Sequence, residues 1–290
     1  MNQNNQSIAD RLFVLLLQIL PHHLLSRLML WLTRWQWAPF KNWFIRKFIR
    51  LFRVDMSQAQ QQNPENFSCF NDFFTRELTE DARPICEIGK LASPADGAIS
   101  AFGDINQDSI IQAKGMDYCL LDLVGGDKEM AELFNDGSFA TIYLSPRDYH
   151  RVHMPLAGQL NRMHHVPGRL FSVNDATART LPRLFTRNER VVCLFDTDNG
   201  PMAMILVGAI FVGAMDTVWA GTITPADLRV TSWDYSDRET TLKLDKGEEM
   251  GRFNMGSTVI LLYPKGKVEW DEALMDGTVV RMGKSLGTIR

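Results

Sequence analysis

The sequence predicts an α+β fold, with a mainly antiparallel β body preceded by a group of amphipathic helices. In the first 53 residues, apolar side chains alternate with aromatic and basic ones. After Pro84, short runs rich in Val, Ile, Thr and Phe alternate with Gly, Asp and Pro, which is typical of strands and turns. Helical stretches are too few in this second part for a regular alternation of strands and helices. The composition, 45% hydrophobic and 22% charged over 290 residues, is that of a globular protein.

Residues 1–53 are predicted to form amphipathic helices that associate with a membrane. They carry eight basic side chains and one acid, whereas the whole chain has a net charge of −3, so the remaining body is acidic. Pro21 and Pro39 divide the segment into apolar runs shorter than the roughly 20 residues of a membrane span. Indole and guanidinium groups suit the headgroup region of anionic lipid; four of the seven tryptophans lie here: Trp31, Trp35, Trp37 and Trp43. The alternative is a helical layer packed on the body or on a second subunit.

Residues 54–290 are predicted to form a β-rich catalytic domain. A short helical patch is expected at 70–78 and one helix over 119–134. The expected strands lie at 98–102, 109–113, 140–144, 191–196, 202–212, 218–223, 241–244 and 257–263. The four cysteines have no CxxC spacing, which favours free thiols in a reducing compartment. No glycine-rich phosphate loop follows a strand, and basic residues do not interleave with aromatics in the body, so nucleotide and nucleic-acid binding have no support.

Two of the six histidines are candidates for chemistry. His150 and His153 lie three residues apart in a segment dense in ionisable groups, which raises the probability of a functional role. By contrast, the pair at 164–165 precedes a Pro-Gly dipeptide and is predicted to lie in a surface turn. Asp96 precedes Gly97, where it is either a turn residue or the carboxylate that orients a histidine.

Ser257 follows Gly256 at the start of an apolar strand, and this arrangement permits attack on the preceding peptide bond. Gly256 has no Cβ, so its carbonyl can be approached closely. Attack by the Ser257 hydroxyl would replace the amide by an ester. Elimination at Cα would then release the upstream chain, and hydrolysis with loss of ammonia would leave a pyruvoyl group. The reaction needs a base near Ser257, and His153 oriented by Asp96 is the candidate.

Six short segments are distributed over nearly the whole chain: FFTREL at 73–78, PADG at 94–97, YLSPRDYHRVHMP at 143–155, FTRNER at 185–190, TVWAG at 217–221 and GST at 256–258. Together they resemble the bacterial, membrane-associated, pyruvoyl-dependent phosphatidylserine decarboxylases. The family usually has Leu where this chain has Met255. That exchange preserves volume and apolar character, so processing is expected to be retained.

The resemblance implies roles for particular residues. Asp96, His153 and Ser257 would form the relay for self-cleavage between Gly256 and Ser257. The products, 1–256 and 257–290, would form a heterodimer or a dimer of heterodimers. A pyruvoyl group derived from Ser257 would form a Schiff base with phosphatidylserine and release CO₂ and phosphatidylethanolamine, with no metal or diffusible cofactor. His150 would contact the substrate carboxylate or return a proton to Cα. The expected location is the cytoplasmic side of the inner membrane, as a peripheral protein.

Other functions remain open on the residues alone. Ser257, His153 and Asp96 also suit a serine hydrolase acting on an external ester. His150, His153 and Asp96 could instead be zinc ligands of a hydrolase. A third alternative is a non-catalytic peripheral lipid-binding protein anchored by its N-terminal helices.

Overall fold

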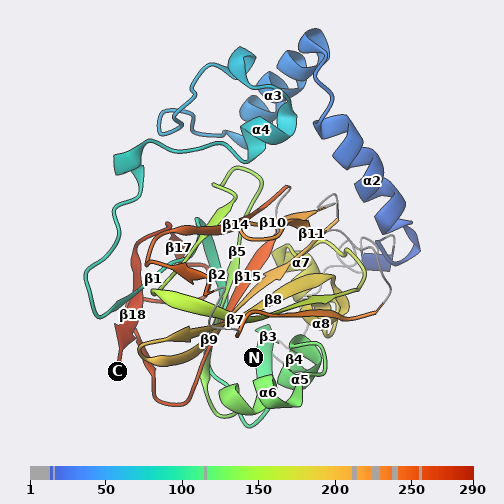
Figure 1. The fold of residues 1–290 in the computed structure, drawn as a ribbon. Helices are drawn as coiled ribbons and strands as arrows, with labels where there is room; N and C mark the ends of the chain where they lie inside the picture. The colour runs from blue at the N-terminus through green and yellow to red at the C-terminus, as the bar shows by residue number, and fades with distance from the viewer. Residues whose placement is uncertain are drawn as a thin grey trace, which may run out of the picture.

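The computed structural model describes residues 14–15, 17–113, 116–210, 214–223, 229–236, 241–254 and 257–290. Two amphipathic helices, α2 (His22–Thr33) and α3 (Ala38–Phe52), lie outside the strand body in Figure 1. Pro39 occupies the first turn of α3, where a missing N–H costs nothing. The helix ends at Arg53, which adopts a left-handed conformation (φ 55°). No helix in the described ranges is long and apolar enough to cross a membrane.

The short helix α4 (Phe70–Phe74) packs against α3 through aromatic rings. Phe44 of α3 stacks on Phe70 with ring centroids 4.4 Å apart. The cluster around this contact is separate from the main core and consists of Ile45, Phe48, Val54, Phe67, Phe70, Phe73 and Phe74. It therefore joins residues from both sides of position 53, and the division into domains at that position stays a prediction.

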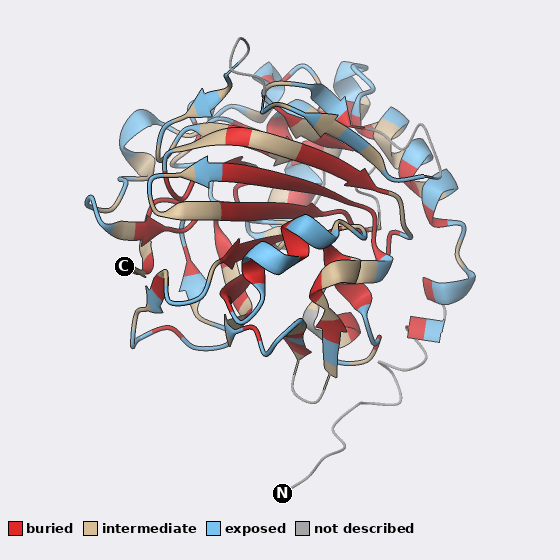
Figure 2. Ribbon diagram, turned by 60° about the horizontal axis from the view of Figure 1, so that its bottom comes forward, coloured by how far each residue is buried: buried red, intermediate tan, exposed pale blue. Residues whose placement is uncertain are grey.

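The body is built on a nine-stranded antiparallel sheet with the order β12-β7-β8-β9-β15-β5-β2-β17, and β13 pairs with β7. Its central strand, β15, is buried at all six positions between β9 and β5. Figure 2 shows that the neighbouring strands are also buried along most of their length. The strands are β2 (Gly97–Asp104), β5 (Ser138–Tyr143), β7 (Gly158–Val166), β8 (Arg190–Thr197), β9 (Gly200–Val207), β12 (Thr231–Asp234), β13 (Lys243–Leu244), β15 (Thr258–Tyr263) and β17 (Val279–Val280).

Three smaller sheets and several short helices complete the body. One sheet contains β1 (Lys90–Ala92), β18 (Ser285–Ile289) and β16 (Val268–Trp270). A second contains β11 (Gly221–Ile223), β10 (Met215–Thr217), β14 (Glu249–Phe253) and β6 (Arg151–His153), and the third is the β3 (Ser109–Ala113) and β4 (Met116–Cys119) hairpin. The short helices are η1 (Pro64–Asn66), η2 (Glu80–Ala82), α5 (Leu120–Leu123), α6 (Lys128–Phe134), α7 (Asp175–Ala178) and α8 (Leu184–Arg187).

The predicted α+β class with N-terminal helices is confirmed, but several element boundaries differ. The helix expected over 119–134 is two helices, because Gly125 and Gly126 adopt positive φ values of 79° and 89° between them. The strand expected over 202–212 ends at Val207, and the helical patch at 70–78 ends at Phe74. Of the strand expected over 218–223, only the last three residues pair, as β11.

The prediction that His164 and His165 lie in a surface turn is wrong. Both are buried in β7, between β12 and β8. His164 Nε2 lies 2.9 Å from an Asp127 carboxylate oxygen, and His165 Nε2 lies 3.1 Å from Glu189. A carboxylate from the N-cap of α6 and one from the residue before β8 thus occupy the Nε2 atom of each imidazole. These contacts offset part of the cost of placing polar side chains in an interior strand. The four cysteines are free thiols, as predicted.

Candidate active site

Two connections between the large sheet and the sheet containing β6 run side by side. One links β5 to β6, and the other links β14 to β15. Near one end, Leu144 N donates to the Ser257 carbonyl (2.8 Å); near the other, Phe253 N donates to the His150 carbonyl (3.0 Å). Since β5 pairs with β15 and β6 pairs with β14, the same junction holds Ser257 and His150.

Ser257 precedes the central strand β15 and is fully buried. Its Oγ has no hydrogen-bond partner among the described residues. A buried hydroxyl without a partner is destabilising by about 1–3 kcal/mol, and such a group is free to take part in chemistry. Met255 and Gly256, and with them the acyl side of the predicted cleavage bond, lie outside the described residues.

His150 is a buried neutral imidazole with one unoccupied nitrogen. Its Nδ1 lies 2.8 Å from the Asp148 carbonyl, and since a carbonyl only accepts, Nδ1 carries the proton. The Nε2 lone pair has no partner among the described residues. The ring packs on Phe74 with centroids 4.1 Å apart. Burial lowers the pKa of His150 to about 3 against the opposing effect of the Asp148 carbonyl, so the ring is uncharged at neutral pH.

His153, the last residue of β6, has both ring nitrogens occupied. Nδ1 lies 2.8 Å from the Gly247 carbonyl and therefore carries the proton. Nε2 is consequently an acceptor, and the Tyr149 hydroxyl donates to it at 3.0 Å. Burial lowers the pKa of His153 as well. In this arrangement Tyr149 occupies the nitrogen that would take a proton.

Asp96 immediately precedes β2, on the other side of β5 from Ser257. Ala98 and Thr258 both face Tyr143 of β5, so the backbones of β2 and β15 are roughly 10 Å apart here. Asp96 forms a bidentate ion pair with Arg83, in which Nε donates to Oδ1 at 2.8 Å and Nη2 donates to Oδ2. Oδ1 also accepts from the Met282 amide at 2.9 Å.

The three residues of the predicted relay therefore lie in one region but are not joined into a hydrogen-bonded chain. The His153 amide donates to the Pro94 carbonyl (2.8 Å), which brings β6 beside the Asp96 segment. No hydrogen bond between Asp96 and His153 occurs in the described structure; each side chain is held by other partners. The described residues also contain no group of three or more His, Cys, Asp or Glu placed to hold a metal ion.

Sequence reasoning assigned no role to Arg83, Tyr149 or Phe74, which hold the candidate residues in place. Arg83 lies 13 positions from its partner Asp96, and no periodic pattern predicts such a contact. Phe74 stands out in the sequence only as part of the FFTREL segment. Tyr149 is adjacent to His150 in the sequence, but its hydroxyl contacts Nε2 of His153, four residues further along the chain.

Comparison with known proteins decides the family. The family model described as phosphatidylserine decarboxylase matches residues 70–288. The chain belongs to the phosphatidylserine decarboxylase family. A second family model, described as PSD, matches residues 12–53. The resemblance and the enzyme class predicted from the sequence are thereby confirmed.

Relatives of similar length share about half of the residues. The chain is 50% identical over 283 residues to a protein of Alcanivorax borkumensis, covering 97% of each chain. It is 52% identical over 282 residues to one of Stutzerimonas stutzeri, covering 97% of this chain and 95% of the relative. It is 53% identical over 279 residues to one of Bordetella pertussis, covering 96% and 94%. Each of these relatives is named a phosphatidylserine decarboxylase proenzyme.

Proposed function

We propose that the chain decarboxylates phosphatidylserine to phosphatidylethanolamine and CO₂, using a pyruvoyl group that it makes from Ser257. The observation that carries this proposal is the buried, unpartnered Ser257 Oγ at the start of a central strand, in a chain of this family. A bound pyruvoyl group supplies a ketone that takes up the substrate amine and withdraws electrons as CO₂ leaves. The position fits such a small group because the side chain it replaces is buried and makes no hydrogen bond in the described structure.

Self-cleavage is proposed to use Asp96, His153 and Ser257. His153 takes the Ser257 proton on Nε2, which requires that the Tyr149 hydroxyl move off that nitrogen. Burial lowers the pKa of His153, and the Gly247 carbonyl, the Glu249 charge and the Asp96 charge oppose this effect. Asp96 is proposed to act on His153 through that charge. The products are the chains 1–256 and 257–290.

His150 is proposed to act on the bound substrate. Its neutral ring and the face of Phe74 form a weakly polar surface near Ser257. Such surroundings favour the conversion of the charged substrate carboxylate into neutral CO₂. The proton that replaces CO₂ on Cα must first reach Nε2, because Nδ1 donates to the Asp148 carbonyl.

The two chains are expected to stay together after cleavage. The small chain would contain β15, which is bonded on one side to β5 and on the other to β9. It would also contain β17 and β18, which pair with β2 and β1 of the large chain. The sheet hydrogen bonds therefore support a heterodimer. Assembly into a dimer of heterodimers stays a prediction.

Mass spectrometry of the denatured protein tests the cleavage. The expected spectrum has two chains split after Gly256, with the smaller lighter by one ammonia than residues 257–290. Ser257→Ala is expected to remain a single chain of 33.0 kDa. Ser232→Ala, in the edge strand β12, is the matched control and is expected to cleave. A wild-type chain that stays intact after long incubation would refute the proposal.

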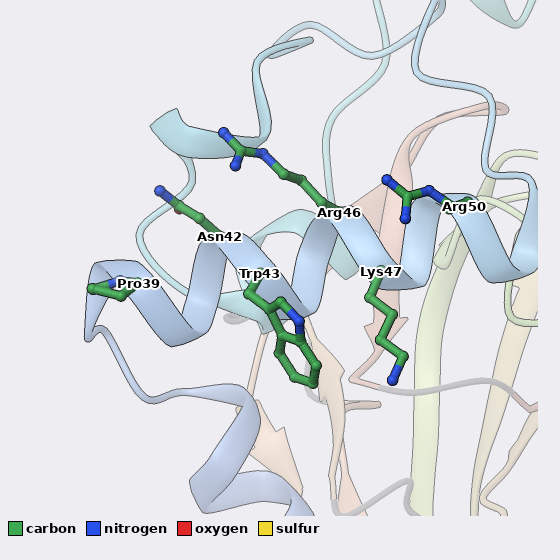
Figure 3. Close-up of a pocket in the computed structure, with 6 residues that line it drawn as sticks. All are labelled: Pro39, Asn42, Trp43, Arg46, Lys47 and Arg50. Carbon is green, nitrogen blue, oxygen red and sulfur yellow. The ribbon is translucent and has the colours of Figure 1, made fainter.

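The N-terminal helices are proposed to hold the protein on anionic lipid at the cytoplasmic side of the inner membrane. Trp31, Trp37 and Trp43 are 61%, 57% and 54% exposed. A groove of about 530 Å³ on α3 is lined by Pro39, Asn42, Trp43, Arg46, Lys47 and Arg50 (Figure 3). Trp43 and Lys47 point to the same side of the helix, with the ammonium 5.0 Å from the ring centroid. This pairing of an indole with a cation suits the lipid headgroup region.

Vesicle binding of a double variant tests the anchoring. Lys47→Gln with Arg50→Gln is expected to weaken binding to vesicles of anionic lipid by about fivefold for each charge removed. The difference is expected to shrink at high salt. Arg183→Gln with Arg290→Gln removes two exposed charges of the body and is expected to bind like the wild type. Undiminished binding by the α3 variant would refute the role of this groove.

A further inference from the structure

Another cavity, of about 260 Å³, is lined both by residues that follow α3 and by residues of the body. It is lined by Arg53 at the C-terminus of α3 and by Asp96 and Tyr149 of the site. Five arginines line it against three aspartates. The cavity is therefore cationic and adjoins the residues proposed for the reaction.

The aspartates of the cavity are already engaged. Asp96 pairs with Arg83. Asp148 accepts from the amide and the hydroxyl of Ser145, each at 2.7 Å, and Asp55 accepts from the Ser57 amide at 2.9 Å. Three of the arginines form no ion pair within 4 Å in the described part of the chain: Arg53, Arg76 and Arg281. The cavity thus has cationic groups in excess of the carboxylates that could neutralise them.

Arg76 is the arginine whose burial and few hydrogen bonds are hardest to explain without a ligand. Its side chain follows α4 and is only 4% exposed. Nη2 makes one long bond, 3.4 Å, to the Arg147 carbonyl, and Nε has no partner among the described residues. The guanidinium lies 5.5 Å from the Phe73 ring centroid. Burial lowers its pKa against the opposing charges of Asp96 and Asp148, neither of which forms an ion pair with it in the described structure. A buried cation with so few direct partners is costly unless an anion completes it.

The same short helix ties this guanidinium to the reaction site. Phe74, two residues earlier, packs on His150. Asn71 donates to the Asn254 side chain at 3.0 Å, in the connection that leads to Ser257. Arg76 therefore follows a helix that contacts both His150 and the connection leading to Ser257.

We propose that Arg76 binds the phosphodiester of the substrate headgroup in this cavity. The inference rests on the proposed function and names the residue that recognises part of its substrate. The headgroup offers two anions, a phosphodiester and a carboxylate. The carboxylate loses its charge as CO₂ leaves, so a cation held on it would stabilise the ground state and slow the reaction. The phosphodiester keeps its charge throughout, and its oxygens match the fork of a guanidinium.

The cavity size agrees with this assignment. Sites for whole small molecules usually occupy about 300–1,000 Å³, and this cavity is smaller. It can take a headgroup but not acyl chains. The lipid tails would then remain on the outside, on the side where α3 ends at Arg53.

Binding of a product-like headgroup tests the proposal independently of cleavage. The ligand is sn-glycero-3-phosphoethanolamine, which has the phosphodiester but no carboxylate. Calorimetry compares the full uncleaved chain carrying Ser257→Ala with the same chain carrying also Arg76→Met. The expected result is an affinity lower by about 10- to 100-fold, the effect of losing a charge-assisted hydrogen bond. Arg183→Met, an exposed arginine of the body paired with Asp122, is the control and is expected to leave the affinity unchanged.

Turnover of phosphatidylserine in mixed micelles gives a second readout on the cleaved enzyme. Arg76→Met is expected to raise KM with little change in kcat, because the phosphodiester contact is the same in the ground and transition states. A fall in kcat at unchanged KM, or glycerophosphoethanolamine affinity equal to that of the parent, would overturn the proposal. If Arg76→Met fails to fold, Arg76→Lys replaces it and is expected to bind more weakly than the parent, since the ammonium keeps the charge without the fork. Absence of cleavage in the wild type, by contrast, would refute the proposed function. The calorimetric test of Arg76 would remain valid in that case, because it uses the uncleaved chain.

Discussion

Removal of Arg83 is the sharpest test of how the site holds Asp96. Both side chains of this pair are nearly buried, with 8% and 10% of their surface exposed. Arg83→Met keeps most of the volume and removes the cation. The variant leaves the Asp96 carboxylate buried beside the Met282 amide, its one other hydrogen-bond donor among the described residues.

The expected loss of stability follows from this burial. Breaking a buried ion pair by removing one partner costs about 3–5 kcal/mol, because an uncompensated charge remains. The control is Arg46→Met, which breaks a pair with Glu65 whose side chains are 56% and 49% exposed; such exposed pairs contribute about 0–1 kcal/mol. Adding Asp96→Asn to Arg83→Met is expected to recover part of the loss, since it removes the stranded charge.

Urea unfolding of the Ser257→Ala chain measures these differences, because this background is expected to stay a single chain. Fluorescence of the tryptophans and far-ultraviolet circular dichroism would follow the transition. A loss below about 1 kcal/mol for Arg83→Met, or a further loss on adding Asp96→Asn, would refute the assignment of a buried, charged pair.

Three further predictions concern the same region. His150 has a folded pKa of about 3 against 6.5, so its contribution to stability is present above pH 6.5 and is lost as the pH falls toward 3. Between pH 6.5 and 5.5 the Ser257→Ala chain is expected to lose about 1 kcal/mol more than the same chain with His150→Gln in urea unfolding, and equal losses would contradict this. Gly97→Ala would place a Cβ 2.3 Å from the Tyr143 carbonyl and is expected to lower stability by about 1–3 kcal/mol; an unchanged unfolding midpoint would exclude that close contact. Tyr149→Phe removes the hydroxyl that occupies His153 Nε2 and is expected to speed the appearance of the small chain by about 2- to 12-fold. Mass spectrometry over time measures this rate. Slower cleavage would contradict the prediction and show that the hydroxyl assists the reaction.

The strands that could be predicted are those whose apolar residues form uninterrupted runs. Residues 258–263 are all buried in β15, and their composition alone indicates an interior strand. By contrast, β7 contains His164 and His165 and appears polar in sequence. Its interior position depends on carboxylates from Asp127 and Glu189, which lie far away along the chain. Local patterns cannot supply such long-range compensation.

The site was predictable only in part for a similar reason. His150, His153, Asp96 and Ser257 stand out by residue type and by the family resemblance. The structure places Ser257 and His150 at one junction and brings the His153 strand beside the Asp96 segment. The groups that determine their protonation do not stand out. The carbonyls of Asp148 and Gly247 fix the tautomers of the two histidines, and every residue has a carbonyl. Which one faces an imidazole is decided by the fold.

In the proposed maturation, the central position of β15 makes activity an all-or-none property of each molecule. The strand must be seated between β5 and β9 before Ser257 reaches the surroundings in which it can react. A substitution that slows assembly of the sheet would therefore reduce the number of molecules that ever mature, while those that do mature work at the normal rate. Damage to the scaffold and damage to the chemistry can thus be told apart by counting mature molecules and dividing the turnover by that number.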